Sequence, residues 1–149
     1  MKLEFRKLSG KYDRLSITRA DGSTTGVDCP KQGMIPHDMV HYAVESVLAG
    51  RRFLSNVRDG AGADFTDGSS EEAEPVERLV ETMQADTWSM GGATPVDELI
   101  ALYELGCEAR GHGAAPVTAD DIAAIRARMD ALARQWAAVP LNGSLILSL

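Results

Sequence analysis

Residues 36–48, PHDMVHYAVESVL, mark the point at which the spacing of apolar side chains changes from two residues to about 3.6. Pro36 suits the first position of a helix, where its missing N–H donor is not needed. Gly50 is a suitable helix end. The apolar residues between them fall on one stripe: Val40, Val44, Val47 and Leu48. The change of period separates a strand-forming part of the chain from a helical part.

Residues 1–29 show the alternation of apolar and polar side chains that is typical of half-buried strands. The inward-facing positions are Leu3 and Phe5, Leu15 and Ile17, and, more weakly, Val27 and Cys29. Turns are expected at Ser9-Gly10 and at Asp21-Gly22. The second should be a two-residue type I′ hairpin, because Asp-Gly suits two positions of positive φ. Three strands are therefore predicted.

Three more helices are predicted after a surface loop, rich in Gly, Asp and Ser, at residues 51–70. The first should begin at residues 69–72. The second should open at Thr94-Pro95 with Thr94 as its cap, and the third at Thr118. The third helix carries a narrow apolar seam that is expected to lie in the core: Ile122, Ile125, Met129, Leu132 and Trp136. It also carries three arginines that are expected on solvated faces: Arg126, Arg128 and Arg134.

After Pro140, a turn at Asn142-Gly143 leads to an apolar segment that is typical of a closing strand. Strands followed by helices and one last strand predict an α+β fold in a single domain, residues 1–149. We expect a small antiparallel sheet of three N-terminal strands plus a C-terminal strand, with about four helices. Residues 2–29 and 144–148 should share that sheet.

Composition and charge exclude several classes of protein. The formal net charge is −7 and the isoelectric point about 4.9, so a polyanion such as nucleic acid should be repelled. No apolar run approaches the roughly 20 residues of a membrane span, and no signal peptide is visible. Cys29 and Cys107 are then expected as reduced thiols. These features predict a cytoplasmic monomer or small homo-oligomer.

The polar residues of the 36–48 stretch lie on one slanting ridge, because His37, His41 and Glu45 follow one another at intervals of four. At about 100° per residue, Val44 and Leu48 fall within roughly 20° of His37. His37 should therefore be largely buried in the apolar stripe and His41, at its edge, only partly buried. Tyr42 and Ser46 should face solvent.

Three interpretations of this ridge stay open. In the first, His37 bonds a backbone carbonyl and His41 pairs with Glu45 at the rim. In the second, the ridge lines a polar pocket for acid–base chemistry or small-molecule binding. In the third, His37, His41 and Glu45 bind a metal, because two imidazoles one helical turn apart aim at one point. Asp38 or Glu45 would then supply a catalytic base.

The string HDMVH, residues 37–41, resembles the HExxH helix of zinc metallopeptidases, with Asp38 in the place of their general base Glu. The chain departs from that pattern in two ways. Asp is one methylene shorter than Glu, and Glu45 is the only nearby residue that could serve as the third ligand.

A longer segment, IPHDMVHYAVE, preceded by strands and followed by helices and a terminal strand, resembles a family of small uncharacterised bacterial proteins with an HDxVHxxxE helix. This resemblance implies the α+β fold and points to His37, Asp38, His41 and Glu45. It implies no activity.

The sequence thus predicts a small cytoplasmic binding or regulatory domain with a polar pocket along helix 36–49 and an unknown small molecule or protein as partner. The alternative is a metal-dependent hydrolase that uses His37 and His41 as ligands and Asp38 or Glu45 as base. A divalent transition metal such as zinc is the one cofactor that the pattern suggests.

Overall fold

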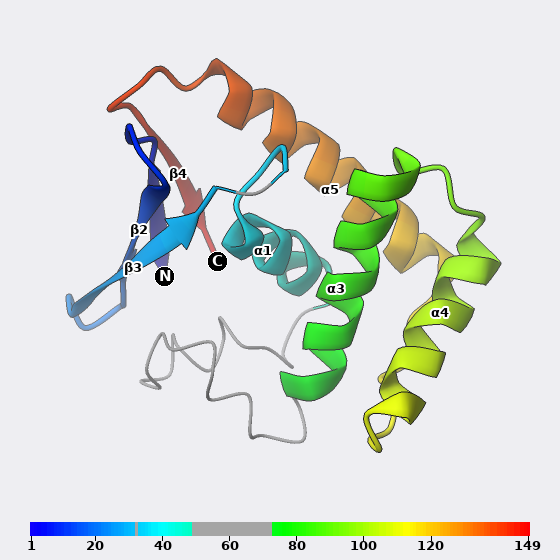
Figure 1. Cartoon of the computed structure of the whole chain (residues 1–149). Coiled ribbons are helices and arrows are strands. Elements are labelled where there is room, and N and C mark those ends of the chain that lie inside the picture. The colour runs from blue at the N-terminus through cyan, green and yellow to red at the C-terminus, as the bar shows by residue number, and fades with distance from the viewer. Residues whose placement is uncertain (32, 49–72) are drawn as a thin grey trace.

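The computed structural model describes residues 1–31, 33–48 and 73–149, and shows an α+β fold in which helices cover one face of a sheet (Figure 1). The predicted loop at 51–70, the helix end at Gly50 and the helix start at 69–72 lie outside the described residues. With the labels of Figure 1, the elements are β1 (Lys2–Arg6), β2 (Tyr12–Thr18), β3 (Thr24–Pro30), α1 (His37–Val47), α3 (Ala73–Met90), α4 (Val96–Ala109), α5 (Ala119–Ala138) and β4 (Ser144–Ser148).

The sheet is antiparallel, with strand order β3-β2-β1-β4. Leu3 of β1 stands opposite Ile17 of β2 on one side and Leu147 of β4 on the other. Reciprocal backbone bonds of 3.0 and 3.1 Å also join Met1 to Leu149. The prediction that residues 2–29 and 144–148 share one sheet is therefore confirmed.

The hairpin between β2 and β3 differs from the predicted two-residue turn. Arg19 and Ser23 pair across it, and the amide of Gly22 donates to the carbonyl of Arg19 at 3.0 Å, so three residues form the loop. Gly22 has φ +86°, whereas Asp21 does not have positive φ. A three-residue loop that ends in a left-handed residue also matches strand twist, and it needs only one glycine.

The sheet packs its apolar face onto the helices. Leu3, Phe5, Leu15 and Ile17 are fully buried, while the residues between them stay in contact with solvent. Helix α1 lies at the centre of the helical layer, packed against α3, α5 and β3 (Figure 1). The predicted seam of α5 is buried in the same core, whereas α4 packs mainly against α3.

The starts of α1, α4 and α5 follow their sequence signals to within one residue, whereas α1 ends at Val47, before the predicted Gly50. Thr118 and Asp121 form a reciprocal capping box at the start of α5. Pro36 and Pro95 are the N-cap residues of α1 and α4 and not, as predicted, their first helical residues. Thr94 therefore does not cap α4. Its amide donates instead to Asp86 Oδ1 at 3.1 Å.

Asp86 is the centre of a buried network that ties α3 to α5 and to the turn before α4. Arg126 of α5 donates to Asp86 Oδ2 through Nη2 at 3.0 Å and Nε at 3.2 Å, and also to the carbonyl of Thr94. The prediction of a solvated side chain is therefore wrong for Arg126, although Arg128 and Arg134 are exposed. Burial alone would raise the pKa of Asp86, but the bonds from Thr94 and Arg126 outweigh it and the pKa is lowered.

Cys29 and Cys107 are buried and not bonded to each other, as predicted. Within the described ranges, the helices include none whose length and apolar character would let it cross a membrane.

The Asp86 network predicts a pH-dependent stability. A carboxyl whose pKa is lowered on folding stabilises the protein at any pH above its pKa in the unfolded chain, here 3.8. This stabilisation is lost as the pH falls through the pKa of the same carboxyl in the folded protein. Asp86→Asn should lower the free energy of unfolding by about 2 kcal/mol at neutral pH. Urea denaturation should show the same gap between wild type and variant from neutral pH down to about pH 5, and a gap that narrows as the pH falls below the unfolded value of 3.8. A gap that stays constant would contradict this account.

Candidate functional site

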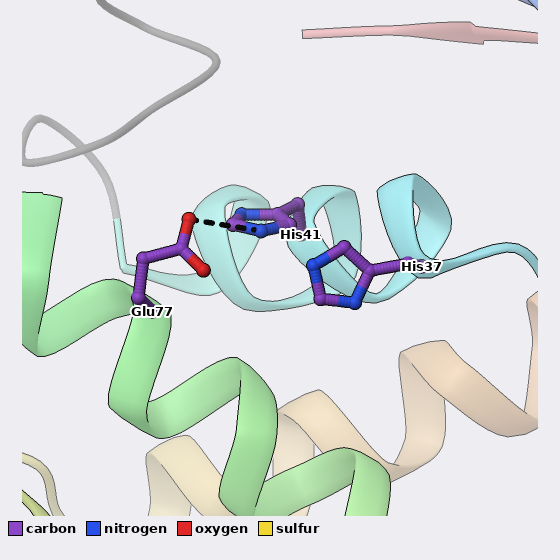
Figure 2. Close-up of side chains that lie close together, drawn as sticks. All are labelled: His37, His41 and Glu77. Carbon is purple, nitrogen blue, oxygen red and sulfur yellow. Dashed lines mark ion pairs between the residues drawn. The ribbon is translucent and has the colours of Figure 1, made fainter. Parts of the chain in front are cut away.

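Two histidines of α1 and one glutamate of α3 meet where these helices cross. The potential ligand atoms of His37, His41 and Glu77 all lie within 4.8 Å of one another. Figure 2 shows both rings on the side of α1 that faces the Glu77 carboxylate. Over the part of the chain that the structure describes, this is the one group of His, Cys, Asp and Glu side chains compact enough to hold a metal ion.

His41 is fully buried between two carboxylates. Its Nε2 lies 3.2 Å from Glu77 Oε1, and its Nδ1 lies 3.9 Å from Glu45 Oε2 (Figure 2 draws the first pair). Burial alone would lower the pKa of His41, but the two carboxylates outweigh it and the pKa is raised. In turn, burial would raise the pKa of Glu77, but its pairing with His41 lowers it. The pair is therefore stabilised as imidazolium and carboxylate.

His37 is held by a different residue of the same facing helix. Its Nδ1 lies 2.8 Å from the amide oxygen of Gln84. Because a carbonyl oxygen only accepts, Nδ1 carries the proton in this bond and the ring lone pair is on Nε2. The His37 and His41 rings meet edge to face, with their centroids 4.8 Å apart.

The helical repeat explains why α3 meets both rings. Glu77 and Gln84 are seven residues apart, which is about two turns and within about 20° of one row on a helix. His37 and His41 occupy one row of α1. His37 pairs with the later residue of α3 and His41 with the earlier one. Two polar rows on antiparallel neighbouring helices thus face each other.

The predicted order of burial is wrong: His41 has no exposed surface, whereas His37 is partly exposed. The prediction assumed that one face of α1 is solvated, but the helix is enclosed on nearly every side. Tyr42, expected in solvent, donates to the carbonyl of Ser148 in β4, and Ser46 accepts a bond from Arg128 of α5. Tyr42 and Ser46 are nevertheless only partly buried, and His37, the first residue of the helix, is the other partly exposed position before Val47.

Neither predicted catalytic carboxylate is a member of the compact His37–His41–Glu77 group, although Glu45 lies beside His41. Glu45 is 2% exposed and stands at the opposite ring nitrogen of His41, so the structure brings Glu77, in place of Glu45, to the two histidines. Asp38 accepts a bond from the Cys29 thiol, whose Sγ lies 3.0 Å from its Oδ2. Burial raises the pKa of Asp38, and burial and Asp38 raise that of Cys29.

A surface hollow opens beside His37. It is lined by His37, Glu81, Gln84, Ala85 and Trp88. The hollow gives solvent and small solutes a route to the exposed end of the histidine pair. Asp38 and Glu45 are not part of its lining.

Sequence reasoning missed Glu77 and Gln84. The one signal for them is their spacing of seven residues, which places both on one row beside the apolar face of α3. The sequence does not show that this row faces the row of His37 and His41, because that depends on how α1 and α3 pack together.

Comparison of the chain with protein-family models, with curated proteins and with solved structures gives no match, so the site is interpreted from its own geometry.

Because His41 is buried more deeply than His37, replacing the two histidines should lower the free energy of unfolding by different amounts. His41→Ala should lower the free energy of unfolding by about 3 kcal/mol, because it leaves the Glu45 and Glu77 carboxylates without the ring between them. His37→Ala should cost about 1 kcal/mol, because its ring is partly exposed and its hydrogen bond is to the uncharged amide of Gln84.

Urea denaturation at about pH 6 with a chelator present would measure both costs without any contribution from metal. A larger loss for His37→Ala than for His41→Ala would contradict the structure.

Proposed function

We propose that the protein is a small metal-binding domain that holds a divalent transition metal, with zinc best suited, through His37, His41 and Glu77. One observation carries this proposal. Two imidazoles from one helix and a carboxylate from the next lie with their ligand atoms within 4.8 Å of one another. Imidazole and carboxylate are ligands that zinc accepts in three-residue sites.

The spacing of the atoms supports the proposal. Tetrahedral zinc bonds of about 2.0–2.2 Å place two ligand atoms about 3.3 Å apart. The 3.2 Å between His41 Nε2 and Glu77 Oε1 already fits this distance. His37, at the first residue of α1 and partly exposed, would complete the set by a small side-chain movement.

The surroundings of the ligands also support it. Metal-binding histidines usually give their second ring nitrogen to a carbonyl or carboxylate, which fixes the tautomer. Gln84 does this for His37, and Glu45 stands at Nδ1 of His41. Glu77 and Glu45 together carry the two negative charges that would balance a divalent cation in this buried place.

This proposal gives the predicted polar pocket along α1 a definite ligand. We further propose that the chain works in the cytoplasm, as a monomer or small homo-oligomer. Two buried thiols that are not bonded to each other support a reducing compartment.

Metal binding can be measured by isothermal titration of untagged protein with Zn²⁺ at about pH 7.5, alongside the thermal midpoint. We expect one ion per chain and a raised midpoint. His37→Ala, His41→Ala and Glu77→Gln should each weaken binding at least about 100-fold, and Glu45→Gln about tenfold, because Glu45 acts through His41. Affinity should fall at lower pH, since the raised pKa of His41 makes the proton a stronger competitor.

Two matched controls isolate the site. Glu104→Gln changes an exposed carboxylate of α4 that does not line the hollow beside His37, and His112→Ala changes the remaining histidine of the chain. Both should bind zinc as the wild type does. Binding that survives His41→Ala, or that is lost with His112→Ala, would overturn the proposal.

A metal-dependent hydrolase is the second candidate, and the hollow beside His37 favours it. Sites with three protein ligands and an open position can activate a bound water. The two predicted bases do not support this candidate, because neither Asp38 nor Glu45 lines the hollow in which a substrate would bind.

The assay is hydrolysis of p-nitrophenyl acetate and bis(p-nitrophenyl) phosphate by the zinc-loaded chain. Turnover above that of free zinc, removed by Glu77→Gln and kept by Glu104→Gln, would establish the hydrolase. Equal rates for the wild type and Glu77→Gln would leave metal binding as the function.

A further inference from the structure

The negative charge of the chain is concentrated in the helical hairpin of α3 and α4. Residues 73–109 contain eight acidic residues and one basic residue, so this segment has a formal net charge of −7, equal to that of the whole chain. The remaining residues balance to zero. Glu77 and Asp86 are engaged inside the protein, whereas the acids at the surface are Glu74, Glu81, Asp97, Glu98, Glu104 and Glu108.

The same hairpin exposes large apolar side chains. Met90 is 60% exposed, Leu102 51% and Leu105 59%. A groove between α3 and α4 is lined largely by apolar surface, with Ala85, Met90, Leu99 and Leu102 among its residues. Figure 1 places α4 on the side of α3 away from the sheet.

Helical spacing joins these residues into one surface. Glu98, Leu102 and Leu105 follow one another at intervals of four and three, so they share one face of α4. Glu108 lies about 60° beyond Leu105, at the edge of that face, whereas Glu104 is on the far side of α4. Glu81 reaches the groove from α3. The result is an apolar strip with acidic residues on both sides.

Charge decides what can occupy this groove. Nucleic acids and anionic lipid surfaces would be repelled by the surrounding carboxylates. The same hairpin of a second copy would bring like charges together at the interface. An amphipathic helix with Lys and Arg beside an apolar stripe has the matching charge and the matching shape for a groove between two helices.

We propose that the groove between α3 and α4 binds a basic amphipathic helix of a partner protein. The apolar side chains of that helix would lie on Met90, Leu99 and Leu102. Its Lys and Arg side chains would pair with carboxylates at the edges, such as Glu81 and Glu98. The groove shares Glu81 and Ala85 with the hollow beside His37, but its lining includes none of His37, His41 and Glu77, so the proposal does not rest on metal binding.

The test uses the full chain and a fluorescein-labelled synthetic peptide of about 18 residues, made of Leu and Lys at helical i, i+3, i+4, i+7 spacing. A scrambled peptide of the same composition measures attraction by charge alone. Fluorescence anisotropy at low and high salt gives the two affinities. We expect the amphipathic peptide to bind at least about tenfold more tightly than the scrambled one.

Surface variants then locate the binding face. Leu102→Ser combined with Leu105→Ser should weaken binding about tenfold or more, and Glu98→Gln should reduce its dependence on salt. The matched control is Leu141→Ser, which changes a leucine that is 58% exposed in the turn before β4 and should leave binding unchanged. Circular dichroism and thermal midpoints would establish that each variant is folded.

Three results would overturn the proposal. The first is equal affinity for the amphipathic and scrambled peptides. The second is an unchanged affinity in the Leu102→Ser, Leu105→Ser variant. The third is a dimer in sedimentation that this variant dissociates, since the groove would then hold a second copy of the chain.

Discussion

The burial of His41, a side chain of α1, is the constraint that the packing of the surrounding helices has to satisfy. The helix is enclosed by β3, α3 and α5, yet it carries ionisable side chains at three positions that have almost no exposed surface: Asp38, His41 and Glu45. Such groups are costly to bury unless partners inside the protein replace water. Glu77 and Glu45 do this for His41, and Cys29 contacts Asp38. The packing of α3 against α1, which brings Glu77 to His41, meets this requirement.

The same constraint connects the fold to the proposed function. An apolar residue in the place of His41 would fill the core at lower cost, so a buried imidazole between two carboxylates is more readily explained as a site than as packing. A divalent cation would take the place of the proton on His41 and bring Glu77 and His37 into one coordination sphere. The α3–α4 hairpin would then serve both roles, since one side of α3 supplies Glu77 to the metal and α4 presents an acidic, apolar groove outward.

Local patterns in the sequence predicted the fold well. Alternation in β1 and β2, the turn at Asn142-Gly143 and the capping box at Thr118 depend on neighbouring residues, and all three are present. Features that depend on distant packing were not predictable. Glu77 meets His41 across 36 residues of chain, and Arg126 finds Asp86 across 40. The burial of His37 and His41 was reversed because helical angles identify the apolar face of a helix but do not show how many sides are covered.

Anomalous scattering at the zinc absorption edge, from a crystal of the protein soaked in Zn²⁺, would locate the bound metal. We expect one anomalous peak about 2.0–2.2 Å from a ring nitrogen of His37, from Nε2 of His41 and from a carboxylate oxygen of Glu77. Glu45 should lie beside Nδ1 of His41 without touching the ion. No peak at this position under saturating zinc, or a single peak at His112 or another surface residue, would contradict the assignment.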